Sequence, residues 1–205
     1  MSVNIDDRWS PVVNLPFDFC FYGNTYNQCL IGSNGIITFD LIGNTPEGYC
    51  GYSFADNIPQ AGLSSLVENS IFGAFHDIDP GISGEVGWEL ITLNSGCRAL
   101  VASWNDVPMF SSTCNSQLYT GMIVLYENTN VIEVYLEEKN SCTTSNGGNA
   151  IVGILAFCSC WSLYNNSCMA RRFWNFWTSY WNFRHYNCLS WRYFNIYSRN
   201  YLYFM

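Results

Sequence analysis

Tyr119-Thr-Gly-Met-Ile-Val-Leu-Tyr126 is a mostly apolar segment, and the polar turn Glu127-Asn-Thr-Asn130 separates it from a second segment, Val131-Ile-Glu-Val-Tyr-Leu-Glu137. In the second segment aliphatic residues occupy alternate positions, whereas Glu133 and Glu137 fall between them. Successive side chains of a strand point to opposite faces, so one face of this strand is apolar and the other is polar. The pattern predicts an antiparallel hairpin in a sheet with one buried and one solvated face.

Segments of the same kind recur along residues 1–155, separated by turn residues. We expect strands over residues 17–22, 27–32, 36–39, 71–79, 85–93, 98–104 and 150–154. Asn34-Gly35 lies between two apolar segments and is a strong hairpin signal, since both residues tolerate positive φ. A short helix is expected over residues 63–69. Many short strands with regular turns indicate an all-β fold. We predict an antiparallel β-sandwich with disulfide bracing, followed by an irregular C-terminal tail.

The composition excludes several classes of protein. Of the 205 residues, 49% are hydrophobic and 12% are charged, so the chain can bury a core and is not globally disordered. Sixteen acidic residues against eight Lys and Arg give a net charge of −8, which makes nucleic acid an unsuitable partner. No apolar run approaches the roughly 20 residues of a membrane-spanning helix, so we expect no transmembrane segment.

The composition changes abruptly near residue 155. Residues 1–155 hold all 16 Gly, all six Pro and all 16 acidic residues but three basic residues, so their net charge is −13. Residues 156–205 contain five Arg and 18 of the 36 aromatic residues. Amino acids whose codons begin with G (Gly, Val, Asp, Glu and Ala) number 49 before the break and two after it. We therefore predict an extracellular β domain over residues 1–155 and an aromatic-rich tail over residues 156–205. The tail is interpreted as a frameshift artefact and not a native domain. The rival interpretations are a partner-binding tail and a membrane-surface aromatic segment, the latter disfavoured because the five arginines show no amphipathic spacing.

Six short motifs of residues 1–155 occur in a characteristic order. They are Phe19-Cys-Phe-Tyr-Gly-Asn-Thr-Tyr26, Gly32-Ser-Asn-Gly35, Gly73-Ala-Phe-His-Asp-Ile-Asp-Pro80, Ser103-Trp-Asn-Asp-Val-Pro108, Ile123-Val-Leu-Tyr-Glu127 with Asn130-Val-Ile-Glu-Val134, and Asn146-Gly-Gly-Asn-Ala-Ile-Val-Gly-Ile154. This series resembles the nidogen-type extracellular domain, over roughly residues 6–154. It is most similar to the version in large cell-surface proteins of gliding Bacteroidetes, which are secreted through the type IX route.

The resemblance implies a role in adhesion or surface architecture, with no catalytic residues to carry over. The expected partners are extracellular matrix, a glycan or a cell-surface protein, and neighbouring domains of a longer parent chain. We expect an extracellular or cell-surface location. The chain shows no export signal, following repeats or sorting domain, so we interpret it as a fragment.

The cysteines of residues 1–155 point to an oxidising compartment. They are Cys20, Cys29, Cys50, Cys97, Cys114 and Cys142, which allow 15 connectivities. Cys114 and Cys142 lie on either side of the last hairpin, so a bond between them would clamp its base. Cys20 and Cys29 fall on adjacent predicted strands, which leaves Cys50 and Cys97 by elimination. Free buried thiols are the alternative.

Asp77 and Asp79 are the candidate ligands of a cation. They are two residues apart on a predicted strand, so both carboxylates face the same side, and Pro80-Gly81 follows. Carboxylate oxygens suit Ca²⁺, the extracellular choice, so calcium is the one cofactor considered. Hydrogen bonds that cap the turn are the alternative role of these carboxylates.

The remaining candidates argue against an enzyme, and no catalytic residue is assigned. His76 is expected to point away from Asp77 on the strand and to be structural. Trp104 ends a predicted strand and could contact a sugar or a protein partner, although a core position is the favoured interpretation. We therefore predict a non-catalytic extracellular module of an adhesion or structural protein. The alternative is a carbohydrate-binding or carbohydrate-active domain that uses surface carboxylates.

Overall fold

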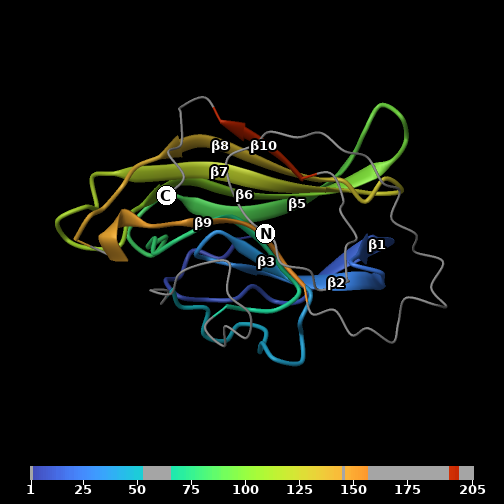
Figure 1. Cartoon of the computed structure of the whole chain (residues 1–205), viewed down its shortest axis with the longest axis horizontal. Coiled ribbons are helices and arrows are strands. Elements are labelled where there is room, and N and C mark those ends of the chain that lie inside the picture. Colours follow the sequence, from blue (N-terminus) through green and yellow to red (C-terminus); the bar gives the residue numbers. More distant parts are fainter. Residues whose placement is uncertain (1, 53–65, 145, 157–193, 199–205) are drawn as a thin grey trace, which may run out of the picture.

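The computed structural model describes residues 2–52, 66–144, 146–156 and 194–198. The strands of these ranges are β1 (Val13–Phe21), β2 (Asn24–Gly32), β3 (Ile36–Thr38), β4 (Ser70–Phe75), β5 (Glu85–Thr92), β6 (Arg98–Pro108), β7 (Leu118–Tyr126), β8 (Ile132–Lys139), β9 (Ile151–Leu155) and β10 (Phe194–Ser198). They form two five-stranded sheets, in the orders β1-β2-β3-β4-β9 and β10-β8-β7-β6-β5. Figure 1 shows the two sheets as stacked layers, with β5–β8 above β1–β3. The predicted β-sandwich is confirmed.

Two predicted hairpins form as expected. β7 and β8 pair antiparallel around the turn at residues 127–130, where Asn128 and Asn130 adopt positive φ values of 66° and 53°. β2 and β3 pair antiparallel around Asn34-Gly35, and Gly35 has a φ of +86°. A Cβ atom on Gly35 would lie 2.8 Å from the carbonyl oxygen of Ala74. Glycine is therefore required here both by the turn and by the close approach of β4.

Some boundaries differ from the sequence-based prediction. β4 ends at Phe75 instead of continuing to residue 79, and Ile78 forms an isolated bridge with Met109. The expected helix over residues 63–69 lies partly outside the described residues, and its described part, residues 66–69, is not helical. In the described ranges the helical element is a short 3₁₀ turn, Asn146–Gly148. Among the described residues, no helix is long and apolar enough to cross a membrane.

The main core lies between the two sheets. Phe19, Ile37 and Ile71 contribute from one sheet, and Trp104 and Ile123 contribute from the other. A second apolar cluster that includes Trp9, Leu30, Ile36 and Phe72 covers the opposite face of β2, β3 and β4. β3 and β4 are therefore buried on both faces. Strands of this kind read as continuous apolar runs without alternation, which explains their sequences.

The predicted tail is described only at Ala156 and at residues 194–198. β10 pairs in parallel with β8, and Phe194 lies opposite Ile132. This is the one parallel pairing among the described strands. The other residues of the tail, on which the frameshift hypothesis bears, lie outside the described residues, so that hypothesis stays a prediction.

Candidate functional site

The disulfide between Cys114 and Cys142 is present, with a Cα–Cα distance of 5.8 Å. Cys114 lies in the loop between β6 and β7, and Cys142 follows β8. Both side chains are buried. Since the bond joins the segments that precede β7 and follow β8, it closes the base of this hairpin. The predicted pairing is confirmed.

The two other proposed pairings are wrong. Cys29 is a free, fully buried thiol whose pKa burial raises to about 12, and Cys20 forms a disulfide with another partner. The register of the β1–β2 hairpin explains this, because Cys20 lies opposite Thr25 whereas Cys29 lies opposite Val13. The two cysteines are therefore near opposite ends of the hairpin, beyond the reach of one bond.

Cys50 and Cys97 are also free thiols, so their pairing by elimination is wrong. Cys50 belongs to the second apolar cluster, on the outer side of the first sheet, and its pKa is raised well above the usual value by burial. Cys97 lies in the turn between β5 and β6 of the other sheet. Elimination failed because it assumed that all six cysteines pair among themselves.

Trp104 is a core residue, so the proposal that it contacts a ligand is wrong. Its side chain is fully buried, and its indole N–H donates a hydrogen bond of 3.1 Å to the carbonyl oxygen of Gly32. Trp104 belongs to β6 and Gly32 to β2, so this bond joins the two sheets. The favoured interpretation of a core position is the one observed.

His76 is buried within the sandwich. Its Nδ1 atom is hydrogen-bonded to the carbonyl oxygen of Ala74, and its ring lies edge-on to Tyr119 with 4.7 Å between ring centroids. Burial, and secondarily the charge of Lys139, lowers its pKa to about 3. His76 is therefore neutral at physiological pH, and its ring is shielded from solvent.

Asp77 and Asp79 lie beside two further carboxylates, Asp6 and Asp7, which no sequence pattern links to them. The pKa of Asp6 is raised to about 6 by burial and by the negative charges of Asp7, Asp79 and Asp77. The Oδ1 atom of Asp6 is buried and has no hydrogen-bond partner in the described part of the chain, which also favours its protonated form. We call these four residues the acidic end.

The N-terminal segment brings Asp6 and Asp7 to this position. Val3 donates its N–H to the Val86 carbonyl at the edge of β5 (2.7 Å). Trp9 then forms an isolated bridge with Gly32 of β2, in the other sheet. The chain between these anchors crosses from one sheet to the other. The period of side chains along a segment reports only its local structure. It therefore cannot indicate that residue 6 lies near residue 77, which is far away along the chain.

The acidic end does not have the arrangement of a metal centre. Within the described ranges, no group of three or more His, Cys, Asp or Glu side chains could hold a metal ion. The Oδ1 atom of Asp79 instead accepts a hydrogen bond of 2.8 Å from the N–H of Gly81. This is the capping role predicted as the alternative to calcium binding. Asp7 accepts a hydrogen bond of 2.8 Å from the Asn34 side-chain amide.

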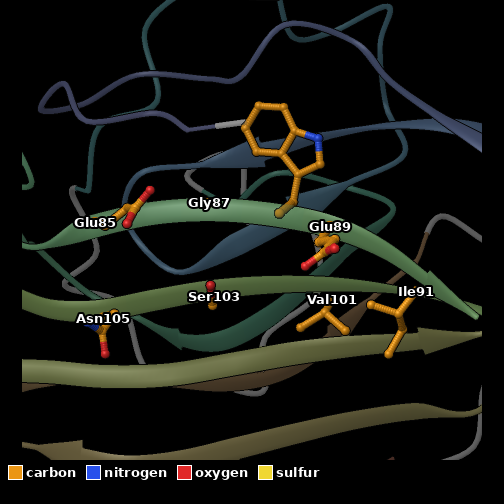
Figure 2. Close-up of a pocket in the computed structure, with 8 residues that line it drawn as sticks. Glu85, Gly87, Glu89, Ile91, Val101, Ser103 and Asn105 are labelled. Carbon is orange, nitrogen blue, oxygen red and sulfur yellow. The ribbon is translucent and has the colours of Figure 1, made fainter.

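A shallow groove crosses the outer face of β5 and β6. It is lined by Glu85, Gly87, Trp88, Glu89, Ile91, Val101, Ser103 and Asn105. Figure 2 shows Glu85 and Glu89 on β5 on either side of Gly87, with Ser103 and Asn105 on the neighbouring strand. The polar side chains of this groove can form hydrogen bonds with a hydroxylated ligand. A carbohydrate-binding domain, the alternative function, would require a surface of this kind.

A comparison with protein families identifies one related group. The family model described as NIDO related matches residues 1–178. The matched range contains β1 to β9, and β10 lies beyond it. No curated protein and no solved structure matches the chain.

Proposed function

The chain belongs to the nidogen-related family, and from this premise we propose that it is a non-catalytic extracellular module of a cell-surface adhesion or structural protein. The disulfide between Cys114 and Cys142 is the observation that carries the proposal. Structural disulfides persist in oxidising compartments, and this one closes the base of a hairpin in the sandwich. Family and disulfide together support an extracellular location.

The non-catalytic part of the proposal is supported by His76. Residues 1–155 contain a single histidine, His76. Imidazole is the side chain most often used for proton transfer near neutral pH. Here its ring packs against Tyr119 inside the sandwich, and its pKa is lowered to about 3. It is held as a neutral packing residue, out of reach of a substrate on the surface.

The finer parts of the proposal follow from the resemblance of the six motifs. We place the module in a large surface protein of the type that gliding Bacteroidetes secrete through the type IX route. Its partners would be extracellular matrix, a glycan or a cell-surface protein, and neighbouring domains of the parent chain. Its formal charge of −8 favours solubility at a cell surface.

Location is the property to test first. Antibodies raised against the purified chain should label intact cells that produce the parent protein, and brief protease treatment of those cells should remove the label. Antibodies against a cytoplasmic protein are the control, and should label only permeabilised cells. Labelling by the first antibody that also requires permeabilisation would contradict the extracellular proposal.

Adhesion is tested with the purified full chain attached to fluorescent beads. The beads should be retained under flow on layers of extracellular matrix protein or of cells, and free chain should compete. Retention that is abolished by soluble oligosaccharides, together with binding on a glycan array, would favour the carbohydrate alternative. Turnover of a glycan by the purified chain would contradict the non-catalytic proposal.

A further inference from the structure

Besides Ile42, four large apolar side chains are exposed in the described loops of the sandwich. Ile5 is 52% exposed, Tyr49 78%, Ile82 51% and Phe110 43%. A single exposed apolar side chain is ordinary, but several in one place indicate a binding surface. Whether these four form one surface therefore depends on where their loops meet.

Backbone hydrogen bonds bring two of them to the acidic end. Ile82 donates its N–H to the Asp79 carbonyl at 3.3 Å. Phe110 donates its N–H to the Asp77 carbonyl at 3.0 Å. The loop that follows β4 and the loop between β6 and β7 therefore meet here, and each carries an exposed apolar side chain.

The other two flank the same carboxylates from the N-terminal side. The negative charge of Asp7 raises the pKa of the Tyr49 hydroxyl, and burial, a hydrogen bond to the Asp7 side chain and the charges of Asp77 and Asp6 add to this. Ile5 directly precedes Asp6 in the chain. The backbone nitrogen of Asp6 is close to Gly81, since a Cβ atom placed on Gly81 would lie 3.7 Å from it. All four apolar residues thus lie next to residues of the acidic end.

We propose that the acidic end and its four exposed apolar neighbours form a docking surface for a basic segment of a partner protein, in which Lys or Arg alternates with apolar residues. This inference rests on the proposed function as an extracellular module, and it names the chemistry of the partner. Aromatic and aliphatic side chains supply buried area at a protein interface, and carboxylates orient the basic side chains.

Charge complementarity selects this occupant. Asp6 lies among the carboxylates of Asp7, Asp77 and Asp79, and their charges add to the effect of burial on its pKa, so the local potential is negative. A guanidinium group can donate hydrogen bonds to two carboxylate oxygens at once, which offsets the cost of removing water from both partners. Anionic glycans and anionic lipid headgroups would be repelled. A neutral glycan would bring no charge to offset the desolvation of four carboxylates.

Binding of a cation should be coupled to loss of a proton from Asp6. The groups that face Asp6 are the carboxylates of Asp7, Asp77 and Asp79 and the hydroxyl of Tyr49. Because the pKa of Asp6 is about 6, this carboxyl is largely neutral at pH 5 and ionised at pH 7.5. A basic partner favours the ionised form, so its affinity should rise over this range.

The test begins with a displayed library of random 12-residue peptides, selected on the immobilised full chain at pH 7.5. The enriched peptides should be rich in Arg or Lys next to aromatic or aliphatic residues. One such peptide is then synthesised, and its Kd is measured by fluorescence anisotropy. An enriched pool without basic residues, or one whose peptides are displaced by sugars, would overturn the inference.

Matched variants locate the binding surface. Asp6→Asn with Asp77→Asn should raise the Kd about tenfold, as expected for the loss of two partly exposed ion pairs. Glu85→Gln with Glu89→Gln removes the same charge from the outer face of β5, and should change the Kd less than twofold. Equal effects of the two pairs would reduce the interaction to general charge attraction and would overturn the inference.

Two further measurements use other properties of the surface. The double variant Tyr49→Ser with Phe110→Ser changes exposed positions only and should weaken peptide binding about tenfold. If the aspartate variant folds poorly, this variant shows whether the peptide binds at the proposed surface. For the wild-type chain the Kd should rise about threefold from pH 7.5 to pH 5, and Asp6→Asn should abolish that change. Absence of both effects would overturn the inference. Cell-surface labelling tests the proposed function separately, since peptide binding does not enter that measurement.

Discussion

Removing the Cys114–Cys142 disulfide is expected to cost a large part of the stability of the sandwich. The two cysteines are 28 residues apart. In the chain-entropy model a loop of this length contributes about 3.5 kcal/mol at 25 °C, because the bond limits the conformations of the unfolded chain. Cys114→Ala with Cys142→Ala should lower the free energy of unfolding by this amount, plus about 1 kcal/mol for each lost buried sulfur atom. A typical domain has only about 5–15 kcal/mol to lose.

Urea unfolding followed by tryptophan fluorescence measures this loss, since Trp9 and Trp104 are buried in the folded chain. Cys29→Ala is the matched control, because Cys29 is a buried free thiol and its truncation removes a sulfur atom without opening a loop. We expect this control to cost about 1 kcal/mol. The difference between the double variant and twice the control isolates the contribution of loop closure.

Two results would refute this reasoning. If the double variant loses no more than twice the loss of Cys29→Ala, the bond does not restrain the unfolded chain. If Cys114 and Cys142 react fully with an alkylating reagent before any reductant is added, the bond is absent from the protein. Mass spectrometry of the alkylated peptides distinguishes these cysteines from the free thiols Cys50 and Cys97.

Three further predictions concern single positions. Because folding raises the pKa of Asp6 from 3.8 to about 6, the wild type loses stability as the pH rises through this range. A shift of this size corresponds to about 3 kcal/mol in full, and solvent around the half-buried carboxyl reduces it to about 1 kcal/mol. Asp6→Asn should therefore stabilise the chain by about 1 kcal/mol at pH 7.5 and not at pH 3.5, whereas the exposed Asp18→Asn should show no such change in urea unfolding. Trp104→Phe should cost about 2–4 kcal/mol in the same assay, because it removes buried volume and leaves a carbonyl without its donor, and a loss below 1 kcal/mol would contradict its bridging role. Gly35→Ala should cost about 2 kcal/mol or more and lower the Tm, since its Cβ would meet the Ala74 carbonyl at a positive φ, and an unchanged Tm would contradict this geometry.

Local features of the fold were predictable from the residues. The turns at Asn34-Gly35 and at residues 127–130 lie within a few residues of the strands that they join, so periodicity and turn chemistry were enough to place β2, β3, β7 and β8. The pairing of Cys114 with Cys142 followed from the same hairpin, because the two cysteines flank it. The end of β4 was misjudged, because Ile78 places a further apolar residue after Phe75 although the strand does not continue.

The candidate site was less accessible to this reasoning. Asp77 and Asp79 were identified by their spacing, but the pattern could not distinguish a cation site from the turn cap that the structure contains. Asp6 and Asp7 carried no signal of their own, because an acidic pair near the start of a chain is ordinary. Their proximity to Asp77 follows from the path of the N-terminal segment, which hydrogen bonds to β5 hold in place.

The residues alone therefore specified the class of fold, the hairpins and one disulfide, since each depends on the period of side chains or on a turn between neighbouring strands. The fates of Cys20, Cys29, Cys50 and Cys97 depended instead on register and on which sheet each strand joins. The acidic end likewise arises where two distant segments meet, and burial there shifts the pKa of Asp6. Contacts between distant segments depend on how the whole chain packs. The arrangement of this surface therefore follows from the packing of the two sheets and could not be derived from the sequence.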